Sequence, residues 1–313
     1  MQTKPFTTPI LFLIFNRPDT TEKVFQQIRK IRPKQFFISA DGPRQHKRGE
    51  DRLCAETQKI VEKVDWKCEL QTNFSKKNLG CRIGVSSGID WFFSHVAEGI
   101  ILEDDCLPDI SFFHFCKVLL KYYRNDERVM HIGGVNFQDG IVRGAGNYYF
   151  SKLNHIWGWA TWKRAWDKYD VNISTYPQLL EQNLLSSICE EPSMRKYWQK
   201  KFGLVYKKEV DTWDYQWQYA LYIHNGLAIL PNHNLVSNIG FDVHATHTID
   251  NFHTLANRST ARIDTVIHPP FIVPDYLADA YTFKKYLNPN KLLKLWRLLP
   301  VKSALANIIK EYI

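Results

Sequence analysis

The 313-residue chain lacks several features that would place it in a special class of protein. Its six cysteines form no CxxC pair and show none of the cysteine and histidine spacings of a zinc site. No apolar run approaches the ~20 residues of a membrane-spanning helix, and the N-terminus does not have the layout of a signal peptide. Internal repeats and low-complexity linkers are also missing. We therefore expect a cytoplasmic protein in a reducing compartment.

The composition is that of a globular protein with excess positive charge. Hydrophobic residues make up 44% of the chain, and 41 Lys and Arg against 32 Asp and Glu give a net charge of +9. This charge suits an anionic partner such as nucleic acid, a membrane surface or a phosphorylated substrate. The basic residues are spread along the chain and not gathered with aromatic residues on one motif, so we expect no nucleic acid partner.

The first hundred residues alternate between buried-strand patterns and amphipathic helix patterns. Apolar runs predict strands at 10–15, 35–40, 67–74 and 99–103, and helices are predicted between them at about 18–31, 48–64 and 85–96. Asp19 and Glu22 have the spacing of a capping box for the first helix. This order predicts an α/β fold with a mostly parallel central sheet flanked by helices, which binds ligands at the carboxyl ends of its strands.

The rest of the chain is less regular. We expect a core helix near 112–123, strands near 128–135 and 147–153, an aromatic segment at 155–169, and helices up to about residue 225. The predicted organisation is a nucleotide-binding half (1–140), a more irregular acceptor-binding half of the same domain (141–268), and a C-terminal helical extension (269–313).

Three adjacent carboxylates stand at the end of the fourth predicted strand: Glu103, its last residue, and then Asp104 and Asp105. Neighbouring like charges repel, so a positive partner is expected. Oxygen ligands at a strand end suit Mn²⁺ or Mg²⁺, which bind through one or two carboxylates and substrate phosphates; a solvated acidic turn is the alternative. Arg17, after the first strand, could meet a phosphate, and Asp41, after the second, could accept a hydrogen bond from a base or ribose.

These residues lie in segments that resemble the glycosyltransferases of GT-A fold. The likeness is closest to the N-acetylglucosaminyltransferase I type and weaker to the inverting family two group. It is carried by "FNRPD" (15–19), "ISADGP" (38–43), "NLGCRIGVSSGIDWFF" (78–93) and "ILEDDCLPDISFF" (101–113), and it covers about the first 140 residues.

The resemblance implies a metal-dependent enzyme that moves a sugar from a nucleotide-diphosphate donor, of UDP type, to a saccharide or lipid-linked acceptor. Arg17 would touch the diphosphate and Asp41 the uracil. Asp105 would contact the metal, with Glu103 and Asp104 serving sugar hydroxyls or metal-bound water. The family two loop has an arginine that is missing here, and Arg82 could supply its charge.

The second half offers candidates for an acceptor site and a catalytic base. Trp157, Trp159, Trp162 and Trp166 could form either an acceptor wall or part of the core. Asp214 begins a predicted helix, where it would be an N-cap or, by resemblance, the general base of an inverting transfer; Asp211 is its rival. His247 could complete a metal or diphosphate site, although a surface histidine is the commoner case.

Other functions and one further partner stay open. A sugar nucleotidyltransferase could share the sheet and the metal, but "FNRPD" has no glycine, whereas these enzymes carry a glycine-rich basic loop after the first strand. A non-catalytic nucleic-acid-binding or carbohydrate-binding protein is a further alternative. The C-terminus combines an apolar stripe between Val301 and Tyr312 with a basic run at 284–297, which could contact a membrane or the protein itself.

Overall fold

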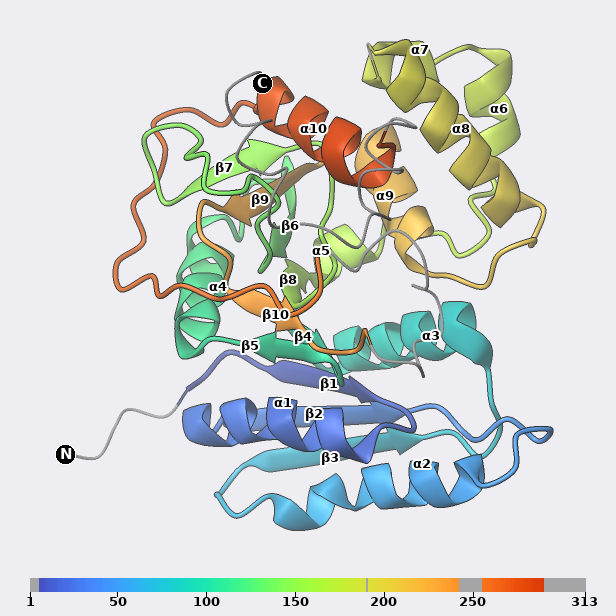
Figure 1. The fold of residues 1–313 in the computed structure, drawn as a ribbon, viewed down its shortest axis with the longest axis vertical. Coiled ribbons are helices and arrows are strands. Elements are labelled where there is room, and N and C mark those ends of the chain that lie inside the picture. Colours follow the sequence, from blue (N-terminus) through green and yellow to red (C-terminus); the bar gives the residue numbers. More distant parts are fainter. Residues whose placement is uncertain (1–5, 190, 242–254, 290–313) are drawn as a thin grey trace, which may run out of the picture.

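The computed structural model describes residues 6–189, 191–241 and 255–289. Within these ranges the centre of the molecule is an eight-stranded sheet with the order β3-β2-β1-β4-β8-β6-β9-β7 (Figure 1). A separate antiparallel pair joins β5 to β10. The strands are β1 (Ile10–Ile14), β2 (Gln35–Ala40), β3 (Glu69–Phe74), β4 (Glu98–Glu103), β5 (Cys106–Pro108), β6 (Val129–Gly133), β7 (Tyr148–Ser151), β8 (Trp159–Trp162), β9 (Leu227–Pro231) and β10 (Val236–Asn238).

The predicted fold class, α/β with a mostly parallel central sheet flanked by helices, is confirmed. Strands β1 to β4 run parallel to one another, whereas β8 is antiparallel to both β4 and β6. The helices are α1 (Pro18–Ile31), α2 (Glu50–Gln58), the 3-10 turn η1 (Lys59–Lys63), α3 (Gly80–His95), α4 (Ile110–Tyr122), α5 (Lys163–Trp166), α6 (Tyr176–Glu181), α7 (Leu185–Ile188), α8 (Pro192–Tyr206), α9 (Asp214–Ile223), α10 (Tyr276–Thr282) and the π-helical turn η2 (Phe283–Leu287).

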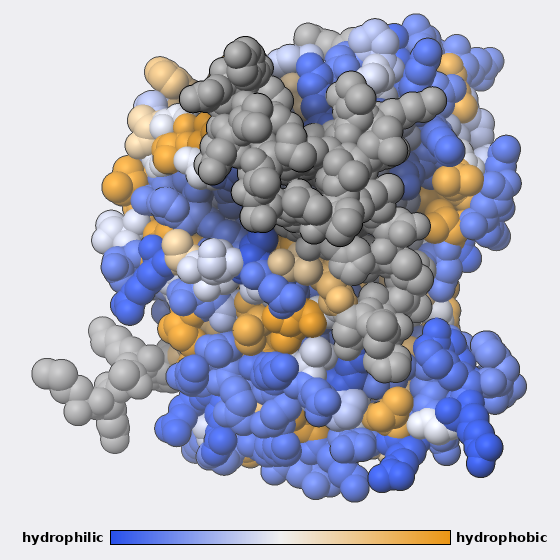
Figure 2. Space-filling view, in the orientation of Figure 1, coloured by the Kyte–Doolittle hydropathy of each residue, from blue (hydrophilic) through white to orange (hydrophobic). Residues whose placement is uncertain are grey.

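The central strands are buried on both faces, which explains their continuous apolar runs. Successive side chains of a strand point to opposite faces. In β1, Phe12 therefore packs into the cluster that contains α1 and α4 side chains, while Leu11 and Leu13 pack with Phe92 of α3. The outer surfaces of α1 and α2 are predominantly hydrophilic in the face shown in Figure 2.

A third hydrophobic cluster holds the helices α6 to α9 together, at the side of the sheet where α9 packs. Its large members are aromatic, among them Trp198, Phe202 and Tyr219. The rings of Trp198 and Phe202 are stacked with centroids 5.4 Å apart. The ring of Phe202 in α8 also meets that of Tyr219 in α9 edge to face, with centroids 5.2 Å apart, so these two helices pack against each other.

Two details differ from the sequence-based expectations. The N-cap of α1 is Arg17, with Pro18 in the first turn, and not Asp19; proline suits the first helical position because its missing N–H needs no partner there. Glu22 hydrogen-bonds Lys63 and Gln26 instead of closing a capping box. The aromatic segment contains a strand, β8, that the sequence did not predict.

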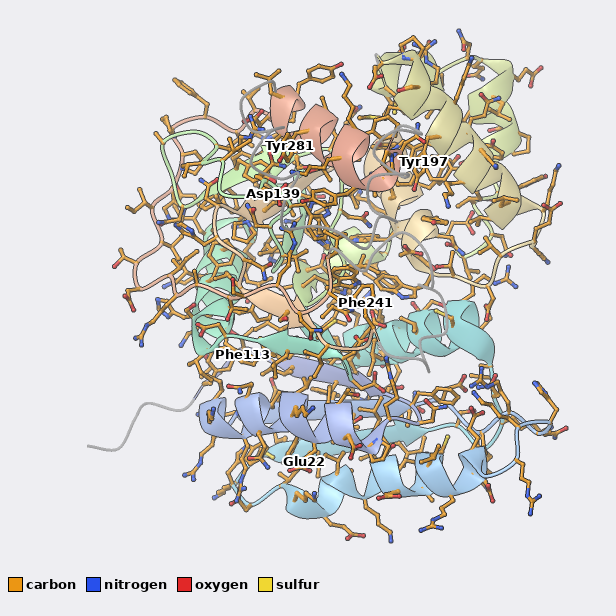
Figure 3. The ribbon with its side chains drawn as sticks, in the orientation of Figure 1. Glu22, Phe113, Asp139, Tyr197, Phe241 and Tyr281 are labelled. Carbon is orange, nitrogen blue, oxygen red and sulfur yellow. The ribbon has the colours of Figure 1, made fainter. Side chains whose placement is uncertain are left out.

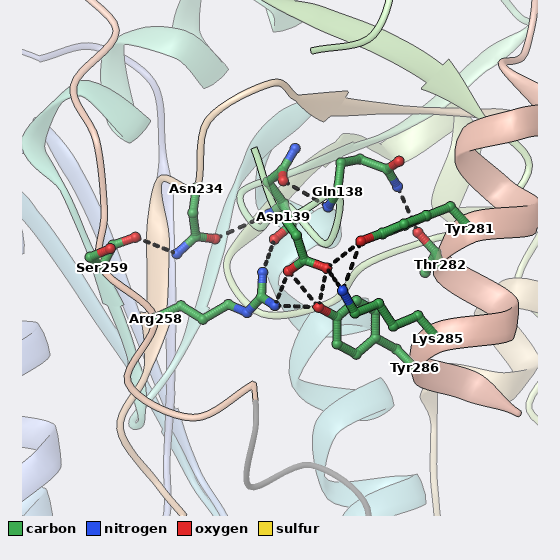
Figure 4. Close-up of polar contacts among 10 residues, drawn as sticks. Gln138, Asp139, Asn234, Arg258, Ser259, Tyr281, Thr282, Lys285 and Tyr286 are labelled. Carbon is green, nitrogen blue, oxygen red and sulfur yellow. Dashed lines mark hydrogen bonds and ion pairs between the residues drawn. The ribbon is translucent and has the colours of Figure 1, made fainter. Parts of the chain in front are cut away.

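The described part of the C-terminal extension is tied to the sheet by Asp139, which lies shortly after β6. Its carboxylate accepts hydrogen bonds from Arg258, Tyr281, Lys285 and Tyr286 (Figure 4). Burial alone would raise the pKa of Asp139, but these donors lower it well below its usual range. The predicted stripe between Val301 and Tyr312 lies outside the described residues. Among those described, no helix is both long and apolar enough to cross a membrane.

Candidate functional site

The three adjacent acids lie where β4 leaves the sheet. Glu103 still pairs with Leu13 of β1, and Asp104 and Asp105 follow in the turn. Asp104 is almost fully buried and accepts the backbone N–H of Phe15 at 3.2 Å. The carboxyl end of the parallel sheet thus presents all three acids together.

Arg17 supplies part of the positive charge that the acids require. Its guanidinium donates Nη2 to Asp104 and Nη1 to Asp105 Oδ2, the latter at 3.0 Å. Burial by itself would lower the pKa of Arg17, but the two carboxylates raise it above its ordinary value. Burial raises the pKa of Asp104, and Arg17 offsets part of this rise. The predicted contact between Arg17 and a diphosphate remains a prediction, since Arg17 here binds the acids.

Glu103 is the acid for which the protein supplies the least compensation. Within the described ranges, no donor hydrogen-bonds to its carboxylate, and burial together with the charges of Asp105 and Asp104 raises its pKa to about 8. A cation beside Glu103 and Asp105 would relieve this repulsion. However, no group of three His, Cys, Asp or Glu side chains in the described part of the chain is placed to hold a metal. Within the described ranges, Glu103 and Asp105 are the carboxylates that this site could offer a divalent ion, and such ions commonly add phosphate and water oxygens.

The strand pair β5–β10 brings a late segment of the chain onto the acids. The N–H of Ile239 donates to the backbone carbonyl of Asp105 at 2.8 Å. A Cβ atom at Gly240 would come within 2.6 Å of Arg17 Nη1. Only glycine, which has no Cβ atom, therefore lets the backbone at position 240 come this close to Arg17.

Asp41, which follows β2, holds the loop before α3. Its carboxylate accepts the N–H groups of Gly42, Leu79 and Gly80 and the side-chain amide of Asn78, at 2.8–3.1 Å. Burial raises its pKa nevertheless, although the backbone donors lower it. The predicted role in base recognition is untested, but Asp41 does line the cavity described below.

Asp211, the rival candidate for the base, caps α3 from a distant part of the sequence. Its two carboxylate oxygens accept the N–H groups of Cys81 (2.8 Å) and Arg82 (2.9 Å) in the first turn of that helix. These are donors that a helix leaves without an internal partner. The side chain of Arg82 is not among those that line the cavity described below, and its predicted role stays a prediction.

Asp214 is the first residue of α9, as the sequence indicated, and it lines the same cavity. Thr212 Oγ1 donates to its carboxylate. Burial raises its pKa, and the hydrogen bond from Thr212, the N–H groups of Asp214 and Tyr215 and the charge of Lys201 lower it only in part. The reason is that the helix terminus here is enclosed by aromatic side chains, so desolvation is the larger effect.

Three of the four tryptophans belong to the core, and the predicted acceptor wall remains untested. Trp159, Trp162 and Trp166 are buried in the core, and the indole of Trp159 is stacked on Trp213 at 5.5 Å. Trp157 lines the cavity and contacts Phe241 edge to face. His247 lies outside the described residues.

These residues surround one cavity of about 640 Å³. The strand ends contribute Arg17, Asp41 and the acids of β4 to its lining, and α8 contributes Tyr197 and Lys201. Figure 3 shows Phe241 near the strand ends and Tyr197 on the helical side. Sequence reasoning missed the contribution of α8, because its apolar pattern indicates only an ordinary packed helix.

A second hollow opens beside the first, between the loop after β2 and the loop after β3. Arg44 and Asn78 line both hollows. The other lining residues are mainly basic: they include His46, Lys47, Arg48, Lys76 and Lys77. Arg44 also binds Glu50, the buried first residue of α2. The basic residues of this second hollow therefore form a positively charged rim beside the acidic cavity.

No family model and no curated protein matches the chain. Among solved structures, a cytidylyltransferase from Leptospira borgpetersenii is 13% identical (66% of this chain, 73% of that one; TM-score 0.31). HddC from Yersinia pseudotuberculosis is 7% identical (52% and 80%; 0.32). A 4-diphosphocytidyl-2C-methyl-D-erythritolsynthase from Anaerococcus prevotii is 6% identical (56% and 77%; 0.30).

The prediction that the chain is a glycosyltransferase is contradicted by this comparison. The structures found include a cytidylyltransferase, which belongs to the class that the sequence offered as its alternative, the nucleotidyltransferases. The predicted inverting sugar transfer with Asp214 or Asp211 as base is withdrawn with it. The function proposed next rests on the geometry of the cavity.

Proposed function

We propose that this chain is a nucleotide-binding transferase of the sugar nucleotidyltransferase class. The observation that supports the proposal is the convergence of Arg17, Asp41 and the three acids of β4 on one cavity. That cavity lies at the carboxyl ends of parallel strands, the edge at which open α/β sheets bind ligands. Its lining combines the strand-end residues with side chains of α8 and α9, which suits an enzyme that binds a nucleotide and a second substrate.

The basic side chains of the second hollow could take the place of the glycine-rich basic loop that nucleotidyltransferases carry after the first strand. A nucleotidyltransferase must neutralise a triphosphate, and the loop after β1 offers only Arg17 as a cation. Arg44, Lys47 and Arg48 lie in the neighbouring loop, and Lys76 and Lys77 face them across the second hollow. We propose that these side chains hold the terminal phosphates. The lysines would act as point charges, and the arginines would donate two parallel hydrogen bonds from their guanidinium groups.

A divalent cation belongs to this proposal. Six carboxylates and three Lys or Arg side chains line the described part of the cavity, so a polyphosphate would meet excess negative charge there. Asp105 and Glu103 are the residues that would hold Mn²⁺ or Mg²⁺. When bound, the ion would neutralise phosphate oxygens.

The reaction proposed is a displacement at the α-phosphorus of the nucleotide. A phosphate oxygen of the sugar phosphate forms the new P–O bond, and the bond from the α-phosphorus to the leaving pyrophosphate breaks. The attacking phosphate is already an anion, so it needs no base to remove a proton. The protein has to position both substrates and stabilise the negative charge between them.

Pyrophosphate release tests this function. We expect the protein with a nucleoside triphosphate, Mn²⁺ or Mg²⁺ and a sugar 1-phosphate to produce pyrophosphate and a nucleotide sugar, and Asp105→Asn to lower the rate at least about 100-fold. Asp264→Asn, at an exposed ion pair with Arg262, is the matched control and should leave the rate unchanged. Production of a nucleoside diphosphate from a nucleotide sugar, without pyrophosphate chemistry, would contradict the proposal.

A further inference from the structure

The part of the cavity that α8 lines contains an ammonium group for which the described residues supply no ionic partner. Lys201 lies on the inner side of α8 and is half-buried. Within the described ranges its Nζ forms no ion pair and no hydrogen bond. A half-buried cation that lines a cavity without a bound anion has lost hydration and gained little in return.

Two tyrosine rings fix the position of this ammonium. Nζ lies 5.4 Å from the ring centroid of Tyr197 and 4.9 Å from that of Tyr215. Tyr215 belongs to α9 and Tyr197 to α8, so the lysine is held where the two helices meet. Cation–π contacts attract the charge but leave the N–H donors of the ammonium available.

The carboxylate whose charge acts on Lys201 is Asp214 of α9. Burial lowers the pKa of Lys201, and Asp214 raises it in part. The two groups line the cavity but are not paired, so together they present donors and an acceptor. Tyr197, Trp198 and Tyr215 line the cavity around them. Aromatic faces beside polar groups suit a sugar ring, and an ammonium suits a phosphate.

We propose that Lys201 marks the subsite for the second substrate, a sugar phosphate whose phosphate contacts Nζ while Asp214 accepts a sugar hydroxyl. This inference rests on the proposed function, and it assigns the second substrate to the part of the cavity built by α8 and α9. The nucleotide would then occupy the part lined by Arg17 and Asp41.

Direct binding tests the inference without any turnover. The probes are glucose 1-phosphate and glucose, titrated calorimetrically into the full-length protein, with a nucleoside triphosphate and Mn²⁺ titrated separately. We expect the wild type to bind glucose 1-phosphate more tightly than glucose. Lys201→Met should weaken glucose 1-phosphate binding at least about ten-fold, the size of one lost hydrogen bond to a charged group, and leave nucleotide affinity unchanged.

Two further variants make the test specific. Lys200→Met changes the exposed neighbour on the same helix, which does not line the cavity, and should bind both ligands as the wild type does. Lys201→Arg keeps the charge and should recover part of the affinity, which separates a lost contact from a misfolded protein. Equal binding of glucose 1-phosphate by wild type and Lys201→Met, or no preference over glucose, would overturn the inference. Failure of the wild type to bind any nucleotide would overturn the proposed function instead.

Discussion

The backbone of Gly240 lies against the carboxylate of Asp105, so closely that a Cβ atom at position 240 would come within 2.3 Å of Oδ2. Gly240→Ala should therefore displace either the segment after β10 or the ion pair between Arg17 and Asp105. We expect a loss of about 1–3 kcal/mol in the free energy of unfolding, as for an overpacked site, and weaker nucleotide binding.

Urea unfolding and calorimetric titration measure these two effects. Gly203→Ala is the control, because a Cβ there meets only Tyr176 Oη at an ordinary 3.6 Å and alanine is the better helix former. Wild-type stability and affinity in Gly240→Ala would show that the segment after β10 does not press on the acids.

Asp211 should behave as a helix cap and not as a catalytic group. Asp211→Ala removes the acceptor for the N–H groups of Cys81 and Arg82 and should cost about 1 kcal/mol of unfolding free energy, the typical value for a lost cap. Asp211→Asn keeps an acceptor oxygen and should cost less. Thermal denaturation of both variants, combined with the rate of pyrophosphate release, distinguishes the roles: a stable Asp211→Asn protein without activity would make Asp211 catalytic.

Glu50 should make stability depend on pH in the acid range. Burial alone would raise its pKa, but hydrogen bonds and charge from Arg44, with help from Asn16, lower it from 4.5 to about 2. A carboxyl whose pKa is lower in the folded state stabilises the fold fully above its unfolded pKa. This contribution should therefore be lost as the pH falls from about 4.5 to about 2.

Urea unfolding at several pH values measures the effect. Glu50→Gln should be less stable than wild type at pH 7 by about 1–3 kcal/mol, because Arg44 loses a charged partner, and the difference should shrink toward pH 2. An equal difference at both pH values would contradict this origin. Asp65→Asn, at an exposed pair with Arg29, is the control and should change stability little.

The C-terminal membrane contact remains a prediction that vesicle co-sedimentation can test. Full-length protein and a chain ending at Pro289 should be compared on anionic and neutral vesicles. This end point retains Lys285 and Tyr286, and with them the contacts to Asp139. We expect only the full-length protein to sediment with anionic vesicles; equal sedimentation of both chains would exclude the C-terminus as the contact.

The sequence predicted best those strands that are buried on both faces of the sheet. The strands β1, β2 and β4 each contain at least three consecutive apolar residues, because helices cover both faces of the sheet. It was uninformative for β8, whose partners β4 and β6 lie far from it in the chain and whose Trp-rich sequence fits a strand or a cavity wall equally. The three-residue strands β5 and β10 are too short to produce a period.

The candidate site, like the fold, has a part that the sequence predicted and a part that it did not. Arg17, Asp41, Glu103, Asp104 and Asp105 each follow a predicted strand, so topology alone brought them to one edge. What topology could not show is which charges the protein itself neutralises. Arg17 pairs with Asp104 and Asp105, which lie 87 and 88 positions away in the sequence. Asp211 caps α3 through N–H groups that lie 130 and 129 positions away.

The hydrogen bond from Tyr286 to Asp139 can form only late in the synthesis of the chain. The two residues are 147 positions apart, and Leu287, next to Tyr286, forms part of the cavity wall. At 5–20 residues per second, a ribosome needs roughly 7–30 s to travel from one to the other. The acids of β4 are made before this interval begins and α8 and α9 within it, so late in the interval a nascent chain already carries the described lining residues up to Phe241 but not Leu287.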